Sequence, residues 1–520
     1  MTGRCAFPLD RPVVLDERVQ VRDDAAVLLG GAPWGVIRIT ESARPFLRLL
    51  AQSGRSGCCP ATPTERSLVE VLLARGFVYP APVHHDHDGI GFDIVVPAYE
   101  RPGLLDTCLA SLRACSPAAR IIVVDDASTD PTVGDVARAH GAILLRHAVN
   151  RGPAAARNSG LRASTSPLVA FVDADCAVTP GWLSPLAAHF DDARVCCVGP
   201  RIRPRSGAQG LMARYEDSRS ALDMGRRPEL VTPGAPLGYL PSATLLIRRA
   251  ALGDNTFDEK LRVGEDVDLV WRLVDQGWLV RYEPASIVTH EIRPTVRAWV
   301  RQIFSYGTSA AVLEGKHPQR LRPARVSGWN AAVAALALSR PLTPTTRILG
   351  GLGVAGIATA LLARSLRAAR VDPRLAFLLV GKGLRSDATA AGHVLRRECW
   401  PIGWLALMAA GRYPLGRVAA ATMLGPLVVE WIVERPRVDL PRYLALRLVE
   451  DATYGSGAID GAVEFRRGAV LIPQIRLPHL RRTAKAGGDD QRRTHVTCPS
   501  KSFGIRRTLG LWCRRRRGGF

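Results

Sequence analysis

Hydrophobic and polar residues follow several different patterns along the chain, and each pattern predicts a different kind of structure. Short alternating stretches at Val13–Leu15 and 19–22 predict strands, and apolar residues at helical spacing follow around Leu47 and Leu68. Further along, short apolar runs alternate with helical segments, then long uncharged runs appear, and a basic polar stretch ends the sequence. We therefore expect four regions, at residues 11–82, 91–315, 320–480 and 481–520.

The region 91–315 has the regular alternation that is typical of a parallel β-sheet protein. Strand–helix alternation of this kind predicts βαβ units, an α/β fold and a mainly parallel sheet covered by helices on both faces. Ligands in such sheets bind beyond the carboxyl ends of the strands. The expected strands are 92–97, 120–125, 142–145 and 167–172, and the expected helices are 104–114, 132–139 and one that starts near 150.

Pairs of acidic residues stand where two of these strands end. Asp125 and Asp126 follow one strand, and Asp173 and Asp175 follow another. Because strand side chains alternate, Asp173 and Asp175 are expected on the same side. Two carboxylates beside an apolar strand are costly unless a divalent cation or another partner compensates them. The alternative interpretation is a turn, which Asp also favours.

Five segments in this order resemble the family 2 glycosyltransferases of the GT-A fold. The resemblance implies a nucleotide-diphospho-sugar transferase core, Rossmann-like in its βαβ organisation, and a nucleotide sugar as donor. The segment 238–248 also resembles the acceptor side of that family. The five segments are VVPAYERP (95–102), VVDDASTD (123–130), NRGPAAARN (150–158), FVDAD (171–175) and GEDVDLVWR (264–272).

The resemblance also implies which residues bind the donor. Asp125 and Asp126 would accept hydrogen bonds from the base and ribose. The alternative, a capped turn before the next helix, applies to Ser128 but explains the acid pair poorly. Arg157 would lie near the base or phosphates, with a surface arginine as the alternative, and Arg272 would orient a carboxylate or bind phosphate. The full expected donor set is Pro97, Tyr99, Glu100, Asp125, Asp126, Arg157, Asp173, Ala174 and Arg272.

Metal binding and catalysis are assigned by the same resemblance. Asp173, Asp175 and His290 would hold Mg²⁺ or Mn²⁺ on the diphosphate, although a lone His is often structural. Asp266, with Glu265 beside it, would be the base that takes the proton of the acceptor hydroxyl. The two acids could also stand at the N-cap of a helix 267–274. The family inverts the anomeric centre, so an α-linked donor would give a β-linkage.

The first region, 11–82, predicts a small α+β domain. It resembles the PqqD-like domains that bind a ribosomal peptide as an added strand, with an ordinary winged-helix-like accessory domain as the alternative. Together, the head, the GT-A core and a helical C-terminal region resemble the mycofactocin-system glycosyltransferases. That resemblance implies glucose transfer from UDP-glucose to a peptide-derived redox cofactor precursor. A lipid-linked or cell-wall acceptor and a non-catalytic peptide-binding module stay open. A dinucleotide oxidoreductase is disfavoured because the first strand is not followed by a Gly-rich turn.

Charge and hydropathy bear on where the chain works. The net charge is +23, of which +10 lies in the basic tail 481–520. This charge suits anionic partners, and arginine-rich codon usage is the alternative explanation. We expect no specific nucleic-acid partner. The uncharged runs 326–339, 348–363, 399–411 and 418–429 are shorter than the ~20 residues of a span. Buried helices or membrane-surface helices fit them better, and only 348–363 stays open as a span. Scattered Cys and no visible export signal favour the cytoplasm, with the inner membrane face as second option.

Overall fold

A computed structural model describes residues 7–8, 10–81, 91–205, 209–253, 256–293, 295–339, 341–368 and 372–476 of the chain. These residues belong to one compact unit, 1–477. The stretch 84–87, whose histidines predict either a solvated linker or a metal-binding tract, and the basic tail 481–520 lie outside the described residues.

The N-terminal region forms the expected small α+β domain. Strands β2, β3 and β4 make an antiparallel sheet in which β3 is central, and β1 pairs with β5. The helices face this sheet with only part of the apolar residues that fall at helical spacing, since Leu47 and Leu72 are buried while Leu49 and Val71 are exposed. The elements are β1 Val13–Leu15, β2 Gln20–Arg22, β3 Val27–Gly30, β4 Gly35–Arg38, α1 Arg44–Gln52, α2 Pro63–Ala74 and β5 Val78–Pro80.

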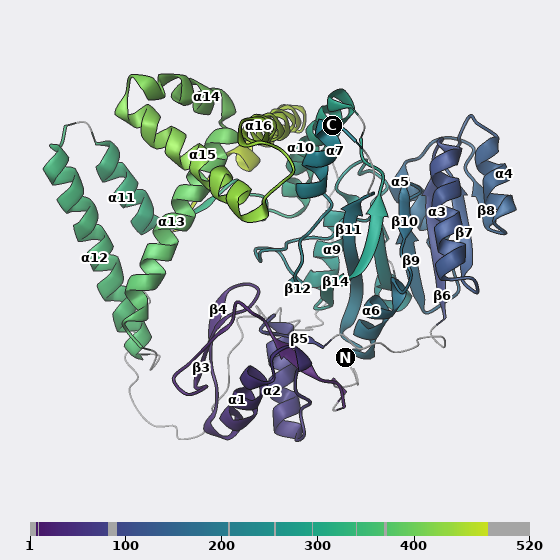
Figure 1. Cartoon of the computed structure of the whole chain (residues 1–520), viewed down its shortest axis with the longest axis horizontal. Helices are drawn as coiled ribbons and strands as arrows, with labels where there is room; N and C mark the ends of the chain where they lie inside the picture. The colour runs from purple at the N-terminus through teal and green to yellow at the C-terminus, as the bar shows by residue number, and fades with distance from the viewer. Residues whose placement is uncertain are drawn as a thin grey trace, which may run out of the picture. The chain divides into compact units, whose positions relative to one another are not determined.

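The second region is built on a nine-stranded sheet (Figure 1) with the order β10-β14-β11-β13-β9-β6-β7-β8, and β12 pairs with β14. The strands β9, β6, β7 and β8 are parallel, as the alternation predicted. The other half is mixed, because β13 runs antiparallel to both β9 and β11. The strands are β6 Phe92–Ala98, β7 Arg120–Asp125, β8 Ile143–Arg146, β9 Leu168–Val172, β10 Cys176–Val178, β11 Val195–Pro204, β12 Glu229–Val231, β13 Thr244–Arg248 and β14 Leu279–His290.

Helices cover both faces of this sheet, and a separate apolar cluster lies under each face. One cluster joins Ile94 and Val96 to Leu105 and Leu109, and the other joins Phe171 to Leu269. Contact is closest where α5 crosses β6, because a Cβ on Gly160 would lie 2.2 Å from Val95 Cγ1. The helices are α3 Pro102–Cys115, α4 Thr132–Ala139, α5 Pro153–Ala163, α6 Leu183–Ala187, α7 Leu211–Ser218, α8 Arg249–Leu252 and α9 Glu265–Asp275.

Helices make up most of the third region, and α10, which begins before it at Val296, packs with them. Two of them, α10 and α16, pack through glycines: a Cβ on Gly307 would lie 2.2 Å from the Tyr454 carbonyl oxygen, and one on Gly457 2.1 Å from that of Phe304. A parallel pair, β15 Arg325–Ser327 and β16 Gln474–Arg476, closes the region. The helices are α10 Val296–Lys316, α11 Gly328–Leu338, α12 Pro344–Ala368, α13 Leu375–Arg396, α14 Trp400–Met408, α15 Pro414–Glu434 and α16 Leu440–Glu464.

The apolar helices of the third region are exposed rather than buried. Two stretches are long and apolar enough to cross a membrane by length and composition alone, Pro344–Arg367 and Pro414–Glu434. In their most apolar windows, 6% and 17% of the residues are buried. The buried-helix interpretation is therefore wrong for both.

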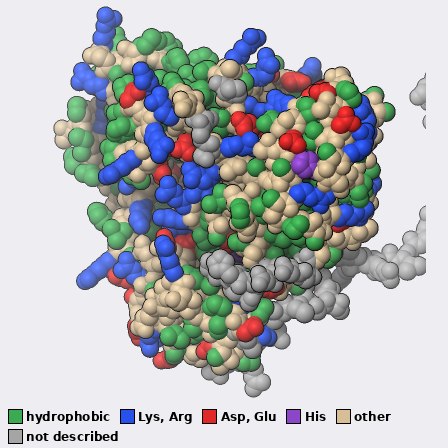
Figure 2. Space-filling view, turned by 45° about the vertical axis from the view of Figure 1, so that its right-hand side comes forward, with side chains coloured by type: hydrophobic (Ala, Val, Ile, Leu, Met, Phe, Trp, Pro, Cys, Tyr) green, Lys and Arg blue, Asp and Glu red, His purple; other side chains and the backbone are tan. Residues whose placement is uncertain are grey.

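Lys and Arg side chains are spread over the face shown in Figure 2 and are not gathered in one patch there.

Candidate active site

A cavity of about 1160 Å³ opens at the carboxyl ends of the parallel strands, where such sheets bind ligands. Its walls come from the strand ends, the start of α9, and helices α10, α13 and α16. Eleven of the residues singled out from the sequence line this one cavity: Pro97, Tyr99, Glu100, Asp126, Arg157, Asp173, Ala174, Asp175, Glu265, Asp266 and His290.

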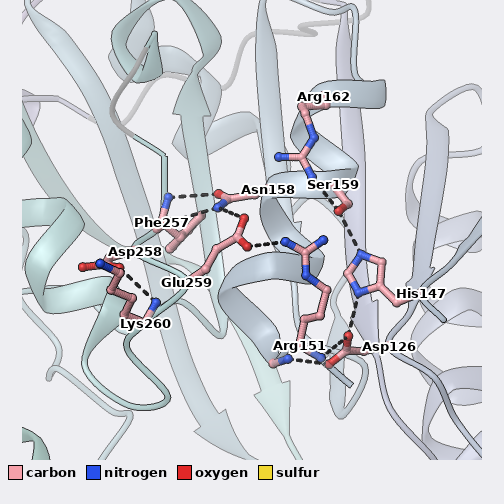
Figure 3. A network of polar contacts seen from close by, with 11 residues as sticks. Asp126, His147, Arg151, Asn158, Ser159, Arg162, Phe257, Asp258, Glu259 and Lys260 are labelled. Carbon is pink, nitrogen blue, oxygen red and sulfur yellow. Dashed lines mark hydrogen bonds and ion pairs between the residues drawn. The ribbon is translucent and has the colours of Figure 1, made fainter. Parts of the chain in front are cut away.

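Asp126 is held at the cavity wall by three donors (Figure 3). Its Oδ1 lies 2.6 Å from His147 Nδ1 and accepts the Arg151 N–H at 2.9 Å, while its Oδ2 accepts the Gly152 N–H at 2.6 Å. His147 Nε2 lies 2.9 Å from Ser159 Oγ. These contacts fix the carboxylate, whose exposure is only 3%. His147 is not among the residues predicted from the sequence, although its position directly after β8 places it at the same edge of the sheet as the acids.

The same network reaches the loop in front of α9. Arg151 forms an ion pair with Glu259 at 2.6 Å, and Asn158 Nδ2 donates to Glu259 at 3.0 Å. Asn158 also exchanges two hydrogen bonds with the backbone of Phe257, at 2.9 and 3.0 Å (Figure 3). The start of α5, beside Asp126, is thereby tied to the segment that leads to Asp266.

Asp125 lies outside the cavity, contrary to a role for both acids of the pair. Its carboxylate is fully buried, accepts the Ser128 N–H at 2.9 Å and lies 3.4 Å from Arg146. Consecutive residues at a strand end point to opposite sides, so one acid faces the cavity and the other the turn. The turn interpretation therefore accounts for Asp125.

Arg157 bridges two carboxylates at the base of the cavity. It lies 2.7 Å from Asp173 and 2.8 Å from Glu265, and its side chain is 3% exposed, so the surface-arginine alternative is wrong. Burial opposes its charge, but Asp173 and Glu265 keep its pKa above the usual range. Burial, with the charge of Asp266, raises the pKa of Glu265 to about 7. Burial also raises the pKa of Asp173.

Asp175 and His290 meet because β10 pairs with β14, with Cys176 opposite His290. Asp175 Oδ2 lies 3.3 Å from His290 Nε2 and 3.8 Å from Arg293. Although burial opposes ionisation, His290 holds the pKa of Asp175 below its usual value. Asp173 and Asp175 belong to a turn after β9, in which Cys176 N–H donates to the Asp173 carbonyl at 2.9 Å.

The expected three-ligand group is not formed. Within the described ranges, no three His, Cys, Asp or Glu side chains gather as they would around a metal ion. Asp173 turns to Arg157, which leaves Asp175 and His290 as the adjacent pair. One carboxylate and one imidazole suit Mg²⁺ or Mn²⁺ when phosphate oxygens and water complete the shell.

Asp266 stands in the first turn of α9 with its carboxylate oriented by backbone. Its Oδ2 accepts the Ser242 N–H at 3.0 Å and its Oδ1 accepts the Val267 N–H at 2.8 Å. The N-cap residue is Gly264, in the left-handed region at φ 85°, so the acids are not the cap.

Arg272 lies away from this site, contrary to the expectation. Its Nε is 2.9 Å from Asp268, and its Nη2 donates to the Thr256 carbonyl at 2.7 Å. Six residues along a helix turn the side chain by about 240°, so Arg272 and Asp266 face different directions.

Comparisons with known proteins show to which family the chain belongs. Residues 93–254 match the model of Glycosyl transferase family 2. A pre-mycofactocin glycosyltransferase of Mycobacterium tuberculosis is 35% identical over 478 residues, which cover 89% of this chain and 97% of the relative. The chain belongs to the mycofactocin-system glycosyltransferases of family 2.

As a mycofactocin-system glycosyltransferase, the chain is an enzyme with a GT-A core. Other relatives match a smaller part of the chain: the succinoglycan biosynthesis protein ExoU of Rhizobium meliloti is 32% identical, over 35% of this chain and 57% of that protein. A mannosyltransferase structure from Pyrobaculum calidifontis is 20% identical, covers 56% of this chain and 84% of its own, and has a TM-score of 0.35.

Proposed function

We propose that the enzyme moves glucose from UDP-glucose to a peptide-derived redox cofactor precursor, pre-mycofactocin, with inversion to a β-linkage. The observation that carries the proposal is that Asp126, Asp175 and Asp266 line one cavity. The name of the Mycobacterium tuberculosis relative supports the acceptor and the pathway. The arrangement supplies, in one space, a donor-binding acid, a metal-binding acid and a base.

Donor binding is assigned to residues of the sheet edge. Asp126 would accept a hydrogen bond from the base or ribose, since its carboxylate is already fixed by backbone N–H groups. Asp175 and His290 would hold Mg²⁺ or Mn²⁺, which supplies positive charge against the leaving diphosphate. Arg157 keeps Asp173 and Glu265 in place beneath the donor and adds a buried positive charge.

Asp266 is the proposed base. It would accept the proton of the acceptor hydroxyl while that oxygen attacks the anomeric carbon and the nucleoside diphosphate leaves. The two backbone N–H groups that donate to it orient the carboxylate. A single displacement of this kind inverts the anomeric configuration, and an α-linked donor therefore gives a β-linked product.

The test uses the purified full chain with UDP-glucose, UDP-galactose or GDP-mannose and the peptide-derived precursor. We expect a mass increase of one hexose or more with UDP-glucose, and an anomeric proton coupling that marks a β-linkage. Preference for another donor would correct the sugar. An α-linkage, or nucleotide release without any transfer to the precursor, would contradict the proposal.

Metal use is tested with the same assay. Chelation should abolish transfer, and Mn²⁺ or Mg²⁺ should restore it. Mn²⁺ binding in the presence of UDP, followed by electron paramagnetic resonance, should weaken at least about tenfold in Asp175→Asn. Unchanged binding in that variant would remove Asp175 from the metal site, whatever its effect on activity.

The N-terminal domain is proposed as a PqqD-like peptide grip. Its sheet has β2 and β4 at the edges, and an edge strand can pair with an extended peptide. Titration of the full chain with the precursor peptide measures its dissociation constant. This constant should increase when Val36, an exposed residue of β4, is replaced by proline. Equal affinity of the Val36→Pro variant and the wild-type chain for the peptide would argue against binding along β4.

A cytoplasmic enzyme held at the inner membrane face, acting on a lipid-linked acceptor, is the second candidate. The exposed apolar surface of α12 favours it, including Ile348, Leu349 and Leu352 with 63%, 63% and 65% exposure. Flotation with vesicles of phosphatidylglycerol should carry the full chain, and Leu349→Glu with Leu352→Glu should abolish this. Absence of flotation would exclude this second candidate and favour a soluble acceptor.

A further inference from the structure

The cavity continues beyond the sheet edge onto the C-terminal helices, and tyrosines line that part. Tyr306 comes from α10 and Tyr454 from α16, while Tyr239 belongs to the segment before Ser242, whose N–H donates to Asp266. Burial, with the nearby charge of Asp266, raises the pKa of Tyr239 and also that of Tyr306. Three rings from separate parts of the chain therefore gather on the side where Asp266 stands.

Two of these rings, those of Tyr306 and Tyr454, are held by side-chain contacts. The Arg397 guanidinium carbon lies 3.5 Å from the ring centroid of Tyr454, and Gln302 Nε2 donates to the Tyr306 hydroxyl at 2.7 Å. The backbone around Arg397 meets α16 so closely that a Cβ on Gly455 would lie 1.8 Å from the Arg397 carbonyl oxygen. A ligand that enters here meets rigid aromatic faces.

The charged groups of this wall are already paired with one another. Burial and the Arg397 charge lower the pKa of His393 to about 4, so its imidazole is neutral near pH 7. What the wall offers to a ligand is thus aromatic ring and hydroxyl, and not net charge. The pairs are Glu450 with Arg447 at 3.1 Å, Asp451 with Arg396 at 2.7 Å and Arg397 with Glu398 at 3.2 Å.

We propose that Tyr239, Tyr306 and Tyr454 form the acceptor subsite and bind an uncharged, ring-bearing acceptor by stacking. The inference rests on the proposed function and adds the substrate class of the acceptor side. Aromatic faces favour offset or edge contacts with flat partners and bury much surface at little entropic cost. A phosphorylated acceptor would find that the described cations of this wall, Arg396, Arg397 and Arg447, already have carboxylate partners.

This subsite assigns a role to the C-terminal helices. Tyr306 and Tyr454 lie outside residues 93–254, the part that matches the family 2 model. The common core would then bind the donor, while α10 and α16, packed on each other through Gly307 and Gly457, select the acceptor.

The experiment measures acceptor KM, donor KM and kcat with two matched probes, 4-nitrophenyl β-glucoside and its charged analogue 4-nitrophenyl β-glucuronide. We expect transfer to the glucoside in preference to the glucuronide. Tyr306→Ala and Tyr454→Ala should each raise the acceptor KM about tenfold, while Tyr454→Phe stays near wild type. Tyr413→Ala removes an exposed tyrosine from the same helical region, at 62% exposure, and should change nothing.

The outcomes separate this inference from the proposed function. Wild-type acceptor KM in both alanine variants, preference for the glucuronide, or no transfer to the glucoside by an enzyme that still binds UDP-glucose would overturn the subsite. Failure to bind any nucleotide sugar would overturn the proposed function itself. UDP-glucose binding by each variant shows whether it is folded.

Discussion

Replacing Arg157 by methionine tests whether its two ion pairs hold the base of the cavity together. Methionine keeps an apolar stem against Phe257, whose ring lies 5.4 Å from the guanidinium, but leaves Asp173 and Glu265 without their cation. Removing one partner of a buried ion pair costs about 3–5 kcal/mol. For a domain of this size, such a loss lowers Tm by roughly 10 °C.

The loss should depend on pH in a defined direction. An unpaired buried carboxylate can take up a proton instead of staying charged. The pKa of Glu265 is already raised to about 7, and that of Asp173 is raised as well. At pH 5.5, where Glu265 is protonated, loss of the cation matters less than at pH 8, so the Tm difference from wild type should be larger at pH 8.

Thermal unfolding at the two pH values is the assay, and Arg281→Met is the matched control. Arg281 is also fully buried, but it donates to the Leu73 carbonyl at 3.1 Å in place of a carboxylate. Its replacement should lower Tm by a similar amount at pH 5.5 and pH 8. An equal loss for Arg157→Met at both pH values, or no loss, would refute the proposed electrostatic role of Arg157.

Three further predictions follow from single contacts. Glu265→Gln should flatten the dependence of the free energy of unfolding on pH. Because the pKa of Glu265 is raised in the folded state, the native state binds more protons than the unfolded state between about pH 4.3 and 7, and wild-type stability falls as pH rises through that window. Calorimetry should show a smaller fall in the variant. Gly307→Ala should lower Tm because its Cβ would meet the Tyr454 carbonyl, whereas Gly353→Ala, with nothing within 4 Å, should leave Tm level or raise it; equal shifts would contradict the packing argument. Asp126→Asn should raise donor KM while Asp125→Asn mainly lowers Tm, and the reverse pattern would exchange their roles.

Part of this site could be predicted from the sequence because parallel strands place their carboxyl ends together. Acids after β7 and β9 were expected at one edge, and Asp126, Asp173 and Asp175 do line one cavity there. Asp266 was placed by resemblance to the family, and the start of α9 brings it to the same cavity. Regular alternation thus carries enough information to gather Asp126 and Asp175, which are 49 positions apart in the sequence.

Other features depend on contacts that a local pattern does not contain. The antiparallel course of β13 depends on how the chain returns after β11, and strand propensity is the same for either direction. The chain turns after Val172 instead of continuing as a strand, and Asp173 therefore faces Arg157 instead of joining the pair formed by Asp175 and His290. Tyr306 and Tyr454 line the cavity because α10 packs on α16. The residue spacing around the sequence motifs does not predict this helix packing.

The most direct test of the central claim is the activity of Asp266→Asn. Asparagine keeps the shape of the side chain and can still accept the Ser242 N–H, so UDP-glucose should bind within about twofold of wild type. Loss of the base should lower kcat by about 10²–10⁴. Binding that is retained with turnover nearly abolished is the expected result. Wild-type turnover in this variant would show that another group takes the proton, and would contradict the account of Asp126, Asp175 and Asp266 as one catalytic cavity.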